Sequence, residues 1–197
     1  MDFEELRVVA LHKHPDCLMA CCDMINDEWP RSVTARLNSL QGSCDNLPTS
    51  LILINNNKTL LGHCKLSPIP SLSRSCFLET VVIAKAMRGK KLGTFMMKKV
   101  EEYCKDILKL DMIHLSTQGQ QDFYSKLGYV VCHPISIYGN VKLKETSTNK
   151  KTKKETTASR QKATKEKTPP PPPPPPPPTS TPTTNKPEQV FMFKKLF

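Results

Sequence analysis

The chain has 197 residues, of which 38% are hydrophobic and 24% are charged, and its formal net charge is +11. This length suits one domain of ordinary size, and the low hydrophobic fraction indicates that part of the chain does not pack. Residues 142–167 hold ten Lys or Arg and three Glu, which supply +7 of that net charge. The basic balance therefore favours a basic linker over a nucleic-acid groove, with a DNA- or RNA-binding arm as the less favoured interpretation.

The eight cysteines follow no metal-ligand spacing, and several lie inside apolar runs, where cysteine behaves as a small hydrophobe. We therefore expect no metal site and a reducing compartment. The N-terminal stretch MDFEELRVVALHKHPD is interrupted by charges, unlike a signal peptide. No apolar run approaches the roughly 18 residues that a membrane helix needs. The expectation is a cytosolic protein that acts as a monomer and does not bind membranes.

The N-terminal third predicts a strand, two helices and a hairpin. Residues 6–11 predict a strand, and Pro15 begins a helix whose apolar positions follow i, i+3, i+4, i+7 spacing. Pro30 should end this helix, and Ser32 can cap a second one. The apolar runs SLILI and LLGHCKLS flank the turn-rich NNNKT, which predicts a hairpin.

From CFLETVVIA onward, strands and helices alternate. That run predicts a long strand, and after the basic loop KAMRGKKLG the apolar positions of residues 92–108 outline one face of a helix. DMIHLS predicts a short strand, GQQDFYSKLGY a short helix closed by Gly128 at its C′ position, and YVVCH a further strand. The order of elements predicts a single α/β (α+β) domain.

The C-terminal part combines a proline run with an apolar end. Residues 169–178 are ten consecutive prolines, which cannot join a packed core because they lack backbone donors. Yet the later VFMFKKL predicts a strand. We expect a core in residues 1–135, a basic and proline-rich insertion in residues 136–188 that is largely disordered, and a final core strand in residues 189–197. Loop closure over such a length costs little more than over a short one.

The stretch ETVVIAKAMRGKKLGTFMMKKVEEYC predicts a strand, a basic loop and the start of a helix. A helix N-terminus with free N–H groups and nearby cations suits phosphates. RGKKLG resembles the acetyl-CoA signature R/Q-x-x-G-x-G/A of the GNAT superfamily of acetyltransferases, with Lys91 in place of the inner glycine. Downstream, TQGQQDFYSKLGY resembles the family pattern N-x-x-A-x-x-L-Y-x-x-L-G-F, with Thr117 and Gln120 where Asn and Ala are common.

This resemblance covers roughly residues 6–133 and the last strand. It implies the GNAT fold, a mixed and mostly antiparallel sheet with splayed central strands flanked by helices, and it implies acetyl-CoA as the cofactor. In that fold, backbone groups of the fourth strand hold the pantetheine arm. The cofactor-binding residues implied by the resemblance are Val81, Val82, Ile83, Arg88, Gly89, Lys90, Lys91, Leu92, Gly93, Thr117 and Gln120.

Three residues are candidate catalytic groups. Tyr124 stands where the family's tyrosine protonates the leaving thiolate, and its alternative is a core or rim aromatic. A base must also take a proton from the amine, directly or through water. His114 is preferred to Glu79 because its intrinsic pKa is near neutral, although each has a structural alternative. Glu79 alternates with Val81 and Ile83, so we expect these side chains to share one face.

A more particular resemblance, carried by INDEWPRSVTARLNSL, ETVVIAKAMRG and the proline-run insertion, is to the metazoan GNAT branch that acetylates actin N-termini. It implies that the substrate is the acidic N-terminus of processed actin and that profilin docks on Pro169–Pro178. Arg31, Arg36 and His114 are the candidate substrate-binding residues. Guanidinium groups at the first two positions suit consecutive carboxylates, whereas two exposed arginines on a helix surface are the structural alternative.

Two other functions stay open. One is a GNAT enzyme that acetylates lysine side chains or small amines. The other is a catalytically weak adaptor that presents its proline run to SH3, WW or profilin-type modules. Lys91 and Thr117 favour the adaptor because they depart from the family pattern.

Overall fold

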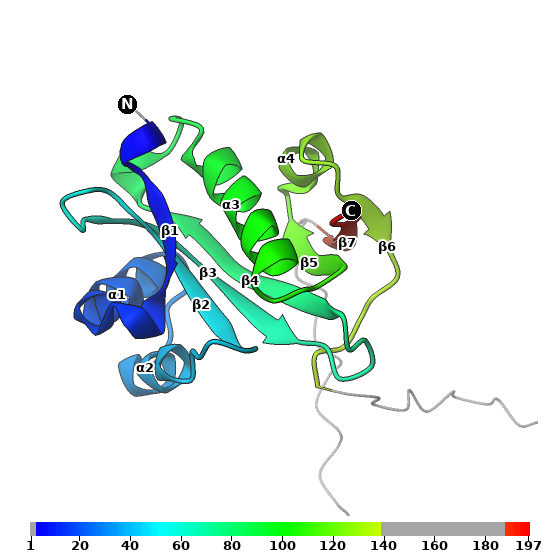
Figure 1. The fold of residues 1–197 in the computed structure, drawn as a ribbon, viewed down its shortest axis with the longest axis horizontal. Coiled ribbons are helices and arrows are strands. Elements are labelled where there is room, and N and C mark those ends of the chain that lie inside the picture. The colour runs from blue at the N-terminus through cyan, green and yellow to red at the C-terminus, as the bar shows by residue number, and fades with distance from the viewer. Residues whose placement is uncertain (1–2, 139–187) are drawn as a thin grey trace, which may run out of the picture. The chain divides into compact units, whose positions relative to one another are not determined.

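The computed structural model describes residues 3–138 and 188–197 (Figure 1). The strands are β1 (Arg7–Ala10), β2 (Thr49–Ile54), β3 (Leu60–Pro68), β4 (Ser75–Ile83), β5 (Met112–Gln118), β6 (Val130–Cys132) and β7 (Gln189–Lys195). The helices are α1 (Leu18–Glu28), α2 (Val33–Gln41), α3 (Leu92–Asp106) and α4 (Gln121–Lys126), with 3₁₀ turns at Phe3–Glu5, Leu11–Lys13, Pro15–Cys17 and Lys85–Met87. The basic linker and the proline run of the sequence prediction lie outside the described residues.

The seven strands form one sheet in the order β1-β2-β3-β4-β5-β7-β6. Only β4 and β5 pair in parallel, and the other neighbours are antiparallel. The last strand of the chain lies between β5 and β6, where Figure 1 shows it in red. The sheet confirms the predicted mixed, mostly antiparallel α/β fold.

Helices α1 and α2 cover one face of the sheet. Pro15 lies in the 3₁₀ turn that leads into α1, which ends two residues before Pro30. Ser32 caps α2 by accepting a hydrogen bond from the Ala35 backbone N–H at 3.5 Å. The buried residues of this layer include Cys21, Cys22, Ile25, Leu40, Ile52, Ile54 and Val82.

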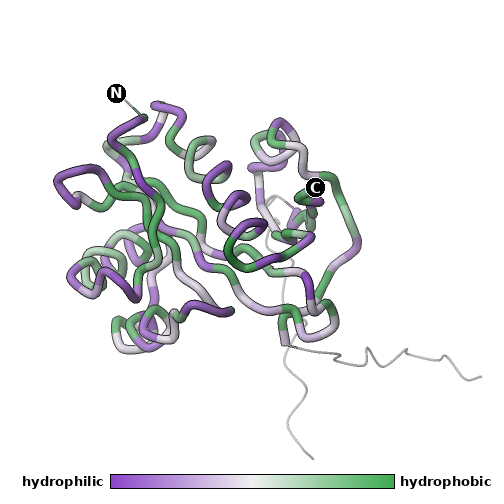
Figure 2. The backbone as a smooth tube through the Cα atoms, viewed as in Figure 1, coloured by the Kyte–Doolittle hydropathy of each residue, from purple (hydrophilic) through white to green (hydrophobic). Residues whose placement is uncertain are grey.

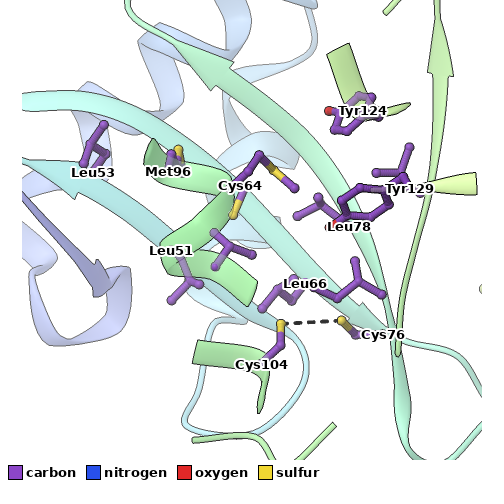
Figure 3. Packing of buried hydrophobic residues seen from close by; sticks show 14 of the residues in the cluster. Leu51, Leu53, Cys64, Leu66, Cys76, Leu78, Met96, Cys104, Tyr124 and Tyr129 are labelled. Atoms are coloured by element: carbon purple, nitrogen blue, oxygen red, sulfur yellow. Dashed lines mark hydrogen bonds between the residues drawn. The ribbon is translucent and has the colours of Figure 1, made fainter. Parts of the chain in front are cut away.

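Helices α3 and α4 cover the opposite face. Every residue of β2 is buried because its odd-numbered leucines face this layer and its isoleucines face α1 and α2. The central strands are accordingly green in Figure 2. Figure 3 shows Met96 of α3 packed near Cys64, with the thiols of Cys76 and Cys104 3.9 Å apart between their sulfur atoms. All eight cysteines are free thiols.

Strand β4 contains an extra residue where it passes β3. Lys65 pairs with Glu79, but His63 pairs with Val82, so two steps along β3 match three along β4. Thr80 is the inserted residue of this β-bulge, and its backbone is left-handed, with a φ of 50°. Beyond this bulge, Val82 packs under α1, while Val81 and Ile83 pack on the α3 side.

The expectation that Glu79 shares a face with Val81 and Ile83 is therefore wrong. One inserted residue reverses the alternation of side chains between the two faces of a strand. Glu79 instead accepts a hydrogen bond from the hydroxyl of Ser67 on the adjacent strand.

Strands β4 and β5 pair only over their first halves. The register runs from Ser75 opposite Met112 to Leu78 opposite Leu115 and goes no further. The five remaining residues of β4 and the three remaining residues of β5 do not pair with each other. This separation confirms the predicted splay of the central strands.

Candidate active site

Two cavities meet where β4 and β5 separate. The first, about 510 Å³, follows the end of β4, the basic loop and the start of α3. The second, about 530 Å³, is lined by the ends of β4 and β5 and reaches Gln189 of β7. Both cavities are lined by Glu28, Trp29, Val81, Gln120 and Tyr124. After the ligands predicted from the sequence, we call the first the cofactor cavity and the second the peptide cavity.

Most of the predicted cofactor-binding residues line the cofactor cavity: Val81, Val82, Ile83, Arg88, Gly89, Lys91, Leu92, Gly93 and Gln120. Thr117 lines the peptide cavity instead, and Lys90 lines neither of these two cavities. Past Leu78, the edge of β4 that faces β5 has no strand partner in the described part of the chain. Its backbone N–H and C=O groups can therefore pair with an extended ligand.

The loop before α3 is shaped to receive an anion. Gly89 and Lys91 both have left-handed backbone conformations, with φ of 78° and 60°. Lys91 is the N-cap of α3 and makes no side-chain capping bond, so the first N–H groups of this helix have no acceptor within it. The left-handed conformation costs lysine about 1–2 kcal/mol, a cost that glycine would not have. The cavity fits a ligand with an extended arm and an anionic end.

Tyr124 lies at the junction of the cavities. Its ring packs edge-on against Phe123 at 5.0 Å and Tyr129 at 5.7 Å between ring centroids. Figure 3 shows Tyr124 and Tyr129 next to each other. Burial raises the pKa of Tyr124 to about 12, so its hydroxyl is protonated at neutral pH and can donate a proton.

The two candidate bases differ in position. His114 is 7% exposed and lines neither cavity; its ring stacks on Phe193 at 5.7 Å between centroids. Burial lowers the pKa of His114, and neither ring nitrogen has a hydrogen-bond partner within residues 3–138 and 188–197. Glu79 lines the peptide cavity. The structure thus brings Glu79, but not His114, to the site.

The two predicted substrate arginines also differ. Arg36 is 8% exposed, and its Nε donates to Asn26 Oδ1 at 3.0 Å while its Nη2 donates to the Trp29 carbonyl at 2.8 Å. Its guanidinium therefore holds the connection between α1 and α2. Arg31 is exposed in that connection, and its carbonyl accepts a hydrogen bond from Asn26 Nδ2 at 3.1 Å. Neither arginine lines either cavity.

Two residues at the site were missed by sequence reasoning. Neither Glu28 nor Trp29 is among the site residues predicted from the sequence. Trp29 is 44% exposed and lines both cavities. Both residues directly precede the helix-breaking Pro30. That position at the end of a helix is the signal that would have placed them on a connecting segment, where binding residues often lie.

The cofactor cavity is linked to α1 by charged side chains. Arg88 Nη2 lies 2.7 Å from Glu28 Oε2, and Arg88 Nε donates to the Ile83 carbonyl at 3.0 Å. Lys85 Nζ donates to the Asp27 carbonyl at 3.2 Å. The loop around the cavity is thus joined to the end of the helix that borders the peptide cavity.

Two further kinds of feature, a membrane-spanning helix and a metal site, have no candidate among the described residues. Within residues 3–138 and 188–197, each helix is too short or too polar to span a bilayer. In the same residues, His, Cys, Asp and Glu side chains form no group of three or more that would hold a metal ion.

Comparison with known proteins identifies the family. Residues 18–129 match the family described as "Acetyltransferase (GNAT) family". Over 127 residues the chain is 36% identical to N-alpha-acetyltransferase 80 of Mus musculus, a match that covers 61% of this chain and only 40% of that relative. The chain therefore spans well under half of the relative's length.

Two solved structures of spermidine N-acetyltransferase from Vibrio cholerae have a similar fold. The complex with CoA and spermine has a TM-score of 0.56 and 22% identity, covering 66% of this chain and 83% of that chain. A dodecameric structure has a TM-score of 0.53 and 19% identity, covering 66% and 82%. At these identities the likeness shows the fold alone. Because the family match spans more than half of the chain, this protein belongs to the GNAT family of acetyltransferases.

Proposed function

We propose that the protein is an N-alpha-acetyltransferase that transfers an acetyl group from acetyl-CoA to an acidic protein N-terminus, that of processed actin in particular. The observation that carries this proposal is the meeting of two cavities where β4 and β5 separate, with Tyr124 lining both. Family membership supports acetyl transfer, and the name of the mouse relative supports the α-amine as acceptor.

The cofactor cavity is proposed to hold acetyl-CoA, which supplies a thioester-bound acetyl group when it is bound. The free edge of β4 at Val81–Ile83 would pair with the pantetheine arm. The N–H groups at the start of α3, together with the cations of the loop, would bind the pyrophosphate.

The peptide cavity is proposed to receive the substrate's first residues. Glu79 lines it and is our first candidate for the group that accepts the amine proton through water, ahead of His114. Tyr124 lines both cavities and holds a proton at its hydroxyl, which the departing sulfur would need. The two carry the acid and base roles at different points of one site.

Arg31 is proposed to select acidic substrates. It is exposed beside Trp29, and its guanidinium has no ion-pair partner within the described residues. A free guanidinium two residues from Trp29, which lines the peptide cavity, favours Asp or Glu and disfavours Lys or Arg in an incoming chain. Arg36 is already bound to the protein, so we assign it the support of this segment.

Profilin docking on Pro169–Pro178 remains part of the proposal, although those residues lie outside the description. Gln189 lines the peptide cavity, so the chain re-enters the fold at the cavity's rim after the insertion. Glu188 comes ten positions after Pro178, which allows at most about 36 Å of chain. A partner on the proline run is thus tethered near the peptide cavity, which raises the local concentration of the N-terminus that it carries.

Mass spectrometry of peptides incubated with the protein and acetyl-CoA tests this function. We expect acetylation at the α-amine of a peptide that starts with three aspartates, and much less when lysines replace them. A copy with a blocked N-terminus and one internal lysine is the control and should stay unmodified. Modification of that lysine, or of spermidine in preference to the acidic peptide, would support the rival enzyme activities. Failure to bind acetyl-CoA in calorimetry would support the adaptor.

A further inference from the structure

We propose that Glu28 is a positioning residue whose ion pair with Arg88 couples occupancy of the cofactor cavity to the position of residues 28–31. We call these four residues the peptide wall. The inference deepens the proposed function and rests on it for the identity of the peptide. The coupling itself depends only on the cofactor cavity and the wall.

One guanidinium connects two elements that are distant in the sequence. Arg88 donates to the carbonyl of Ile83, the last residue of β4, at 3.0 Å and pairs with Glu28, the last residue of α1, at 2.7 Å. The Lys85–Asp27 hydrogen bond, at 3.2 Å, is a second link between the same two segments. The loop that would touch the anionic end of a ligand is thus bound to the start of the peptide wall.

The peptide wall depends on side chains for its position. After α1 ends at Glu28, the next helix begins at Val33, so most of the wall has no regular backbone bonding. Arg36 holds the Trp29 carbonyl and Asn26 holds the Arg31 carbonyl. Through these contacts, a shift at Glu28 is passed to Trp29 and on to Arg31.

A small cavity gives the end of α1 room to move. It measures about 150 Å³ and lies between α1 and the end of β4, lined in part by Met24, Asp27, Lys85 and Arg88. Val82 packs under α1 beside this cavity, and the two polar links connect the end of α1 to Lys85 and Arg88 on its other side.

The direction of the coupling follows from the donors of Arg88. Its Nε and Nη2 are used by Ile83 and Glu28, and its Nη1 has no hydrogen-bond partner in the described part of the chain. A guanidinium has five N–H donors, so Arg88 can bind a ligand anion and Glu28 together. A bound anion then immobilises Arg88, and through it Glu28 and the wall. Cofactor should therefore strengthen peptide binding.

The size of the effect is bounded by exposure. The side chains of Arg88 and Glu28 are 45% and 33% exposed, and an ion pair of that kind changes an equilibrium by at most about fivefold. We therefore expect coenzyme A to tighten the binding of a peptide starting with three aspartates by about threefold to fivefold. In Glu28→Gln this ratio should fall to about one.

Calorimetry on the full chain, with and without saturating coenzyme A, measures this ratio. The matched control is Glu102→Gln, because Glu102 forms a surface ion pair with Lys99 at 2.7 Å on α3, away from both cavities. The control should keep the wild-type ratio. A ratio that is unchanged in Glu28→Gln would overturn the proposal.

Trp29 provides a second measurement that needs no peptide. It is the only tryptophan of the chain and lies in the peptide wall, so its fluorescence reports on the wall directly. Coenzyme A should change Trp29 emission in the wild type and in Glu102→Gln, but less than half as much in Glu28→Gln at saturating ligand. An equal change in all three proteins would mean that the ligand acts on Trp29 directly, which would also overturn the proposal.

The two measurements separate this inference from the function. If the aspartate peptide binds none of the proteins, the proposed substrate is wrong, and Trp29 emission alone decides the coupling. If it binds, the coupling stands only when both the ratio and the emission change are lost in Glu28→Gln.

Discussion

Tyr124 is 9% exposed and lines both cavities where they meet. Packing against Phe123 and Tyr129 fixes the ring, and burial holds the pKa of its hydroxyl at about 12. A hydroxyl with so high a pKa is protonated at neutral pH, so Tyr124 carries a proton that the leaving sulfur can take up.

Tyr124→Phe should therefore lower kcat by about 100-fold and change the KM for acetyl-CoA by less than about twofold, since the ring remains and only the proton is lost. Steady-state kinetics with the aspartate peptide measures both constants. Tyr129→Phe is the matched control, because the Tyr129 hydroxyl is also buried but lines neither cavity. Comparable losses of kcat in the two variants would show that Tyr124 acts only in packing.

His63 should make the protein sensitive to mild acid. It is fully buried in β3, and burial lowers its pKa to about 3. The unfolded chain takes up this proton near pH 6.5, whereas the folded chain does not until near pH 3. The stability contributed by neutral His63 is therefore complete above about pH 6.5 and is lost as the pH falls toward 3. Linkage gives a loss of about 2 kcal/mol at pH 5.

Urea unfolding at pH 7 and pH 5 checks this expectation. Between these values His63→Gln should lose about 2 kcal/mol less than the wild type. The exposed His133→Gln should behave like the wild type. The buried His114, whose pKa is also lowered by burial, adds to the acid sensitivity in the same direction in all three proteins. Parallel losses in the wild type and His63→Gln would contradict the assignment to His63.

At the scale of elements, the bulge at Thr80 organises the site. It places Glu79 on one face of β4 and Val81 on the other, and the strand leaves β5 just before it. Bulges bend a strand and increase its twist, which accounts for a separation so close to the inserted residue. The proposed base and the proposed cofactor edge are thus neighbours in the sequence that face different sides of the sheet.

Arg31, in the connection between α1 and α2, and Arg36, in α2, have different roles. Arg36→Leu should lower the free energy of unfolding by about 2 kcal/mol, because two part-buried acceptors lose hydrogen bonds from a charged donor. Arg31→Leu should change stability by less than about 0.5 kcal/mol. It should instead lower kcat/KM on the aspartate peptide by about fivefold to tenfold, since one charge-assisted contact is lost.

Chemical denaturation and peptide kinetics on the two variants separate these tasks. A neutral peptide serves as the substrate control for Arg31→Leu, because its binding does not require the guanidinium. If Arg36→Leu is as stable as the wild type and loses only activity on acidic peptides, then Arg36 reads the substrate after all.

At the scale of the whole molecule, the end of the chain completes the sheet. Strand β7 pairs with β5 along seven residues and with β6 along three, so residues 188–197 join two parts of the fold and carry Gln189 into the peptide cavity. A long insertion can separate β6 from β7 in the sequence because the entropy of loop closure grows only with the logarithm of length.

Replacing Pro169–Pro178 by ten alternating Gly and Ser residues keeps the length of the insertion and removes its polyproline character. We expect kcat/KM on profilin-bound actin to fall by about tenfold or more, because the tethered partner is lost, while that on the aspartate peptide stays unchanged. Acetylation kinetics on both substrates give the comparison. Equal slowing on both would remove the docking role from the proposal.

The elements themselves were predictable from the sequence because helix and strand formation depends on residues only a few positions apart. The apolar spacing of α1 and α3, the proline that ends α1 and the left-handed Gly128 after α4 all match expectation. The loop at Arg88–Gly93 and Tyr124 belong to continuous motifs and come together around one cavity, while their roles there stay predictions. Local patterns thus sufficed for the fold.

The peptide side depended on tertiary structure. The spacing of apolar residues in β4 does not indicate the inserted residue at Thr80. One extra residue in a strand is revealed only by how the strand pairs with its neighbour, here β3. Packing decides that Arg36, and not Arg31, uses its guanidinium within the protein. The packing of α1 against the end of β4 also brings Glu28 to Arg88, sixty positions away in the sequence. Helices and strands are specified by side chains that are close together in the sequence. Burial and ion pairs between distant residues arise only once the whole chain has packed.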